Sequence, residues 1–175
     1  LAKSSSRSGL LENRSIDEYG DSQGYLTMRK QLCMHHGRLT CIEEHPHKLL
    51  TTLGATQALD LVARLLISPG DHVFVDEPGN GNLIKLIQLA GGHVVGIRRT
   101  ADGPDLEDMK QHLARHEVKA FFCNSTFHNP TGGTITPHNA FGVLRLAVPH
   151  DFFVVADDVY GDLRPGVGHT LAGLA

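Results

Sequence analysis

The 175-residue sequence has no tryptophan, only three cysteines and no strong excess of either charge. Its 16 lysines and arginines stand against 19 acidic residues, and a formal charge of −3 gives no general attraction to nucleic acid or membranes. No apolar run approaches the roughly 20 residues that cross a bilayer. We therefore expect no membrane partner, and DNA binding only through a further N-terminal domain.

The cysteines Cys33, Cys41 and Cys123 form an odd set without a CxxC pair, which predicts reduced thiols in a cytoplasmic protein. The first residues lack the apolar stretch of a secretory signal. We expect 1–18 to form a loose arm and 19–175 to form the domain. A first residue other than methionine and an abrupt end suggest an excised piece of a longer protein.

Cysteine and histidine concentrate between positions 33 and 47. Both residue types bind zinc, but their spacing here follows no closed-site pattern. We expect no metal site.

Apolar runs of strand length alternate with helical stretches along the chain. Strands are expected at 49–52, 72–75, 93–97, 118–123 and 152–156, and helices at 26–36, 55–67, 83–90, 106–116 and 137–148. This alternation predicts an α/β fold with a mainly parallel sheet and helices on both faces. Because ligands bind beyond the carboxyl ends of such strands, residues that directly follow strands are the candidates for a site.

Two of these loops can bind a ligand or be ordinary turns. Gly54, Ala55 and Thr56 start a helix, where free amides and a hydroxyl suit a phosphate. The same residues also suit a plain strand-to-helix turn with Thr56 as the cap. Asn129, in Asn-Pro-Thr-Gly, can hold a ligand oxygen or simply form a turn.

The last apolar strand leads into two carboxylates and a phenol. Asp157 lies at the edge of a dry core, so it needs a cationic partner. Asp158 is expected to be solvated or to cap the next turn, and Tyr160 is close enough to reach the same ligand. Arg98 and Arg99 are expected at a solvated strand end, where they could also contact an anionic partner.

In their order and spacing these motifs resemble the pyridoxal-phosphate-dependent aminotransferases of class I/II, which have fold type I. The resemblance includes YGDSQGYLTMR from Tyr19, Pro-Gly-Asp at 69–71, Asn-Pro-Thr-Gly at 129–132 and Asp-x-x-Tyr at 157–160. The phrases TTLGATQALDL, VDEPGNGNL, HNPTGGTITP and ADDVYGDL resemble more specifically the MocR branch of the GntR transcriptional regulators.

The resemblance implies a cofactor site for pyridoxal 5′-phosphate. Ala55 and Thr56 match the phosphate-binding positions. Asn129 and Tyr160 match residues that bond the 3-oxygen of the pyridine ring. Asp157 matches the aspartate that keeps the ring nitrogen protonated, which makes the ring an electron sink.

Two further implications concern a dimer and a departure from the family. Tyr19 matches a tyrosine that reaches the phosphate of the partner's cofactor, so the resemblance implies a homodimer. Asn80 stands where the family usually stacks an aromatic ring on the cofactor, and an amide offers less apolar contact.

The family's Schiff-base lysine lies some tens of residues beyond the aspartate, and this sequence has no lysine after Lys119. We therefore expect no catalytic residue in this chain and no activity from it alone.

Three functions remain open. The first is part of a MocR/GntR-type regulator whose cofactor domain senses an amine or amino acid. The alternative is a free-standing aminotransferase that transfers an amino group from an amino acid to a 2-oxo acid. The third is a degenerate module used only for dimerisation.

Overall fold

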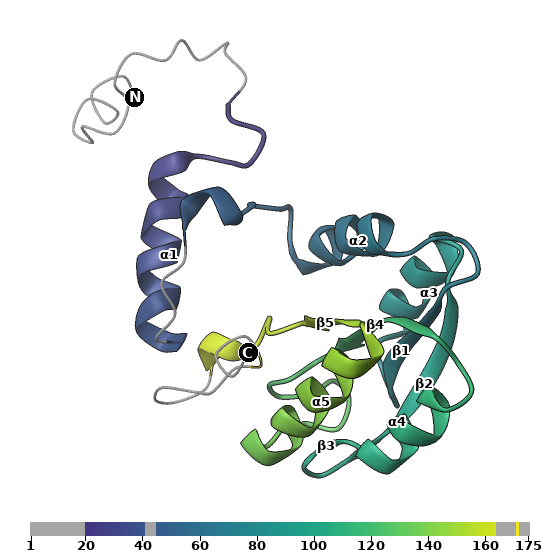
Figure 1. Ribbon diagram of the computed structural model, residues 1–175. Coiled ribbons are helices and arrows are strands. Elements are labelled where there is room, and N and C mark those ends of the chain that lie inside the picture. The colour runs from purple at the N-terminus through teal and green to yellow at the C-terminus, as the bar shows by residue number, and fades with distance from the viewer. Residues whose placement is uncertain (1–19, 41–44, 164–170, 172–175) are drawn as a thin grey trace, which may run out of the picture.

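The computed structural model describes residues 20–40, 45–163 and 171 (Figure 1). Five strands form a sheet in the order β3-β2-β1-β4-β5, in which only the pairing of β2 with β3 is antiparallel. The strands are β1 His72–Glu77, β2 His93–Thr100, β3 Gly103–Pro104, β4 Val118–Cys123 and β5 Phe153–Ala156. The mainly parallel α/β sheet predicted from the sequence is confirmed.

Helices cover both faces of this sheet, also as predicted. The helices are α1 Leu26–Thr40, α2 Ala55–Leu66, α3 Gly81–Leu89, α4 Leu106–Leu113 and α5 Pro137–His150, with short 3-10 turns η2 Pro46–Lys48 and η3 Gly161–Leu163. Helices α2 and α3 pack on one face, and α4 and α5 pack on the other. In the described part, no helix has the length and apolar character needed to cross a membrane.

The predicted strand at 49–52 is wrong. This segment is an extended link with no partner in the sheet. Its polar groups turn instead toward the segment before α1, where the Thr51 amide and hydroxyl donate to the Gln23 carbonyl at 3.0 and 3.2 Å. Four apolar and β-branched residues were too short a pattern to distinguish a link from a strand.

The direction of strand addition reverses between β1 and β4. The connection that leaves β1 passes through α3 to β2, whereas the connection that leaves β4 passes through α5 to β5, in the opposite direction along the sheet. Right-handed crossovers in opposite directions place their helices on opposite faces of the sheet. The connections therefore diverge at the carboxyl ends of β1 and β4, where they leave room for a ligand.

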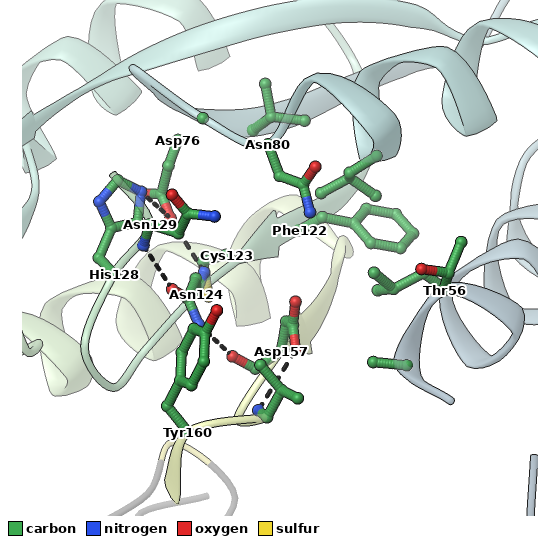
Figure 2. A pocket seen from close by; sticks show the side chains of 16 residues that line it. Thr56, Asp76, Asn80, Phe122, Cys123, Asn124, His128, Asn129, Asp157 and Tyr160 are labelled. Atoms are coloured by element: carbon green, nitrogen blue, oxygen red, sulfur yellow. Dashed lines mark hydrogen bonds and ion pairs between the residues drawn. The ribbon is translucent and has the colours of Figure 1, made fainter. Parts of the chain in front are cut away.

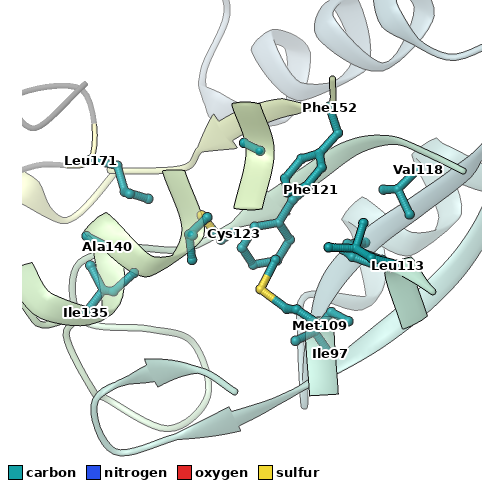
Figure 3. Packing of buried hydrophobic residues seen from close by; sticks show 13 residues of the cluster. Ile97, Met109, Leu113, Val118, Phe121, Cys123, Ile135, Ala140, Phe152 and Leu171 are labelled. Carbon is teal, nitrogen blue, oxygen red and sulfur yellow. The ribbon is translucent and has the colours of Figure 1, made fainter. Parts of the chain in front are cut away.

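Alternation along the strands divides the core into two layers. Phe74 of β1 and Phe121 of β4 face α4 and α5, and both are fully buried. Figure 3 shows Phe121 next to Met109, which is also fully buried. On the opposite face, Val73 packs with Ala63 and other apolar residues of α2 and α3. The two central strands β1 and β4 are therefore buried on both faces, which explains their nearly continuous apolar sequences.

One guanidinium organises the segment around α1. Arg29, only 1% exposed, donates to Asp21 at 2.6 Å and to the carbonyl of Pro46 at 2.7 Å. It also donates to Gln23 at 2.9 Å and to the carbonyl of Gly24 at 3.0 Å. Asp21, Gly24 and Arg29 of the sequence motif that begins at position 19 thus belong to one hydrogen-bonded network.

We predict that Phe121→Ala lowers the free energy of unfolding by about 3–5 kcal/mol, because a fully buried ring leaves a cavity. The control is Phe153→Ala on the neighbouring strand. Its ring is 52% exposed and lies 5.7 Å from Lys119 Nζ, so the cost should stay below about 1 kcal/mol. Urea denaturation followed by circular dichroism measures both, and equal losses would contradict the assignment of the core.

Candidate functional site

A pocket lies at the carboxyl ends of β1, β4 and β5, beside the first turns of α2 and α3 (Figure 2). Its lining includes six of the seven predicted site residues: Ala55, Thr56, Asn80, Asn129, Asp157 and Tyr160. The seventh, Tyr19, lies outside the described residues. The structure thus brings together residues that are more than 100 positions apart in the sequence.

The first turn of α2 presents free main-chain donors to this pocket. Its N-cap is Gly54, with φ 85°, and no side chain caps the helix. The first intrahelical bond joins the Ala58 amide to the Gly54 carbonyl, so the amides of Ala55 and Thr56 precede the helical ladder. Thr56 is therefore not the cap that the plain-turn interpretation required, and this end of the helix suits an anion.

Asp157 reaches the pocket from the end of β5. Its amide donates to the Cys123 carbonyl at 2.8 Å, and its Oδ1 accepts the Val159 amide at 3.3 Å. Burial raises the pKa of the Asp157 carboxyl, the Val159 amide opposes this, and the charge of Asp158 adds to it. Among the described residues, Asp157 has no cationic partner.

Asp158 has a structural position that the sequence did not indicate. The Ser125 hydroxyl donates to Asp158 Oδ1, and the Thr126 hydroxyl lies 3.4 Å from the same oxygen. Both of these hydroxyl residues are buried. Asp158 therefore ties the end of β5 to the loop after β4, and is neither merely solvated nor a simple turn cap.

Asn80 owes its place to the start of α3. It is the N-cap of that helix, and its Oδ1 accepts the Asn82 amide at 3.0 Å. The preceding Gly79 is required by the turn, since a Cβ there would lie 2.1 Å from the Asp76 carbonyl oxygen. Figure 2 shows the remaining amide nitrogen of Asn80 turned toward the pocket.

The loop after β4 brings a histidine and an asparagine to the pocket. His128 is 1% exposed, and its Nδ1 lies 2.8 Å from the Thr131 hydroxyl. Burial and the charge of Arg99 lower the pKa of His128, while Asp76 opposes them. Asn129 is held by its main-chain amide, which donates to Asn124 Oδ1 at 2.9 Å.

Asp76, Arg99 and Asn124 are the residues that sequence reasoning missed. Arg99 was expected in solvent, but its side chain is 1% exposed and pairs with the buried Asp76 at 2.8 Å. Strand alternation was the available signal, because Arg99 follows the buried Ile97 by two residues, and Asp76 likewise follows Phe74. Of the two neighbouring arginines, Arg98 is the one whose side chain extends into solvent.

The pocket has no lysine or arginine among its lining residues. No group of three or more possible metal ligands occurs within the described ranges. Cys33 and Cys123 are free and buried, whereas Cys41 lies outside those ranges. The pocket therefore offers hydrogen-bonding groups, the unpaired carboxylate of Asp157, a buried imidazole, a buried thiol and a helix N-terminus.

Comparison with known proteins identifies the family. The sequence model of the family described as aminotransferase class I and II matches residues 1–174, and the chain belongs to this family. Members of the family depend on pyridoxal phosphate.

The curated relatives include both aminotransferases and a transcriptional regulator. Aromatic-amino-acid aminotransferase 1 of Thermococcus litoralis is 30% identical over 152 residues, which cover 84% of this chain and 36% of the relative. The uncharacterised HTH-type transcriptional regulator YcxD of Bacillus subtilis is 28% identical over 160 residues, which cover 87% of this chain and 36% of that protein. The chain thus spans about a third of these curated relatives.

Solved structures share the fold. An archaeal alanine:glyoxylate aminotransferase has a TM-score of 0.84 and 25% identity, with 90% of this chain and 40% of that chain covered. The α-aminoadipate aminotransferase LysN of Thermus thermophilus, complexed with N-(5′-phosphopyridoxyl)-L-leucine, has a TM-score of 0.73 and 27% identity. That match covers 81% of this chain and 35% of LysN. The sheet and helices described here therefore have the arrangement of fold-type-I aminotransferases.

We predict that Asp157→Asn stabilises the ligand-free chain at pH 7. Burial raises the pKa of Asp157 above its ordinary value of 3.8. At pH 7 the carboxyl is ionised, and the cost of holding this charge in the folded state lowers the free energy of unfolding. The stabilising effect of protonation is complete below pH 3.8 and is lost as pH rises through the raised pKa. The gain from the amide should therefore be present at pH 7 and vanish below pH 3.8.

Urea midpoints across this pH range measure the effect. Asp158→Asn is the matched control, and we expect it to give no gain, because hydroxyl groups already stabilise that carboxylate. A larger gain from Asp158→Asn than from Asp157→Asn would show that the wrong carboxylate had been chosen.

Proposed function

We propose that the pocket binds pyridoxal 5′-phosphate and that the chain is part of the cofactor domain of a MocR/GntR-type transcriptional regulator that senses an amine or amino acid. The observation that carries the cofactor assignment is Asp157, a half-buried carboxylate without a cationic partner among the described residues. The protonated ring nitrogen of the cofactor is a cation of suitable chemistry for this position.

The phosphate is assigned to the first turn of α2. The amides of Ala55 and Thr56, the exposed Thr56 hydroxyl and the positive end of the helix all favour a dianion there. Gly54 supports this arrangement, because its φ of 85° starts the helix without a side-chain cap that would compete for these amides.

The ring is assigned to the other side of the pocket. Asp157 holds a proton on the ring nitrogen, and Asn129 and Tyr160 orient the ring through its 3-oxygen. When bound, pyridoxal phosphate supplies an electron-withdrawing pyridinium that stabilises negative charge developed on a substrate. Asp157 supports that chemistry by keeping the nitrogen charged.

This part of the protein binds and orients but supplies no amine for covalent attachment of the cofactor. No lysine lines the pocket, and Lys119 is the last lysine of the sequence. The family resemblance of the motif at Tyr19, a residue outside the described ranges, is what assigns this tyrosine to the phosphate at the partner's site in the proposed homodimer. The ligand sensed or converted is an amine or amino acid.

The regulator assignment and its alternative have different support. The similarity to YcxD and the MocR-like phrases favour a regulator. Asn80 caps α3 and offers no aromatic ring to stack on the cofactor, which weighs against tight cofactor binding and conventional transamination and favours the degenerate dimerisation module. The alternative, an aminotransferase that uses an amino acid and a 2-oxo acid, is supported by the larger number of relatives named as aminotransferases.

We predict that Asp157→Asn raises the Kd for pyridoxal phosphate by about tenfold or more, because a charge-assisted contact to the ring is lost. Equilibrium dialysis on the 175-residue chain measures this affinity. The control is Asp162→Asn on η3, whose carboxylate is 76% exposed and should not affect binding. Unchanged affinity in Asp157→Asn would contradict the ring assignment.

Assays on the full-length protein can distinguish the two proposed functions. A regulator should bind particular DNA sequences with an affinity that changes when pyridoxal phosphate and an amine or amino acid are added together, and it should form little 2-oxo acid. An aminotransferase should convert amino acid and 2-oxo acid pairs with steady turnover and show no DNA selectivity. Gel-shift and product assays on one preparation decide between them.

A further inference from the structure

A buried ion pair lies at one side of the pocket, near the ends of β1 and β2, and its Asp76 is among the lining residues. Arg99 Nη1 is 2.8 Å from Asp76 Oδ2, and the side chains are 1% and 4% exposed. The neighbouring pair, Arg98 with Asp105, is equally close at 2.6 Å, but its guanidinium is 69% exposed. Removing both charges from water carries a large desolvation cost, so mutual attraction alone is weak evidence for a stabilising role.

The hydrogen bonds of the pair indicate what it does. Arg99 Nη1 donates to the Asn124 carbonyl at 3.0 Å, and Asp76 Oδ2 accepts the Asn124 amide at 3.0 Å. Both main-chain groups of the residue that follows β4 are therefore held by charged partners, which make the stronger class of hydrogen bond. Arg99 Nε, Arg99 Nη2 and Asp76 Oδ1 are buried without a hydrogen-bond partner in the described structure.

The side chain of Asn124, whose main chain is held in this way, contacts two site residues. Its Oδ1 accepts the Asn129 amide at 2.9 Å, and its Nδ2 donates to the Asp157 carbonyl at 2.5 Å (Figure 2). One side chain thus joins the loop after β4 to the end of β5. The α2 turn lies on another side of the pocket and shares none of these bonds.

We propose that Arg99 and Asp76 are positioning residues that act through Asn124 to fix Asn129 and Asp157. They control how the site holds the ring of its ligand, and they leave the phosphate subsite at α2 unaffected. The statement about the ring rests on the proposed function, whereas the clamp on Asn124 is a property of the protein alone.

Three variants of the 175-residue chain and a control test this role. Asp76→Asn combined with Arg99→Met removes both charges and the donor to Asn124. Arg99→Lys keeps one charged donor and is the conservative rescue. Asn124→Ala removes only the link to Asn129 and Asp157.

The control is Arg98→Met, the same chemical change one residue away on the solvent side of β2. Amide hydrogen exchange is measured at residues 124 and 129. The affinities for pyridoxal phosphate and for inorganic phosphate alone are measured separately. Circular dichroism establishes that each variant is folded.

In the double variant we expect exchange at both amides to be about tenfold faster and pyridoxal phosphate binding about tenfold weaker, as for the loss of one charge-assisted hydrogen bond. Asn124→Ala should accelerate exchange at residue 129, weaken pyridoxal phosphate binding, and leave residue 124 protected. Affinity for inorganic phosphate should stay within about twofold in every variant, and Arg99→Lys should lie close to the wild type.

Two results would overturn the positioning role. The first is amide exchange in the double variant at the wild-type rate. The second is a loss of affinity for inorganic phosphate equal to the loss for pyridoxal phosphate, because that would indicate general destabilisation. If the double variant does not fold, unchanged exchange at residue 129 in Asn124→Ala overturns it equally. A wild-type chain that binds no pyridoxal phosphate would refute the proposed function instead, and the exchange data would still decide whether the clamp exists.

Discussion

The parallel pairing of β1 with β4 is the constraint on which the site depends. Because the chain leaves β1 through α3 toward β2 and leaves β4 through α5 toward β5, in opposite directions along the sheet, these two helices lie on opposite faces. The carboxyl ends of these two strands then open toward a common space. Asp76, Asn124 and the first turns of α2 and α3 all face that space because of this one reversal.

The dry core fixes these strands firmly enough for loop residues to be placed with accuracy. Both faces of the sheet are covered, so a shift of one residue in register would turn apolar side chains toward polar surroundings. Asp157 shows the electrostatic consequence of this arrangement. Its half-buried position directly after β5 disfavours its own charge, and a cationic ligand would favour that charge again. The ligand-free protein therefore carries the ionised Asp157 at some cost to its stability.

Asp157 and Asp158 are adjacent in sequence, but their side chains point in different directions and make different contacts. Asp157 turns into the pocket with one hydrogen bond from its own turn, whereas Asp158 turns to the hydroxyl groups of the loop after β4. The second holds the loop against β5, and the first remains available to a ligand. The same division applies to Arg98 and Arg99, one in solvent and the other buried against Asp76.

Much of this arrangement was available from the sequence. Alternating strand and helix patterns determined the parallel sheet, and residues directly after strands proved to line the pocket, since strand ends are set by local pattern. The sequence could not distinguish the extended link at 49–52 from a strand, because a strand exists only through its neighbours. Nor could it pair Asp76 with Arg99, or join Asn124 to Asp157, 33 residues away. Those contacts cross between strands, and only the tertiary structure determines which strands are neighbours and in which register.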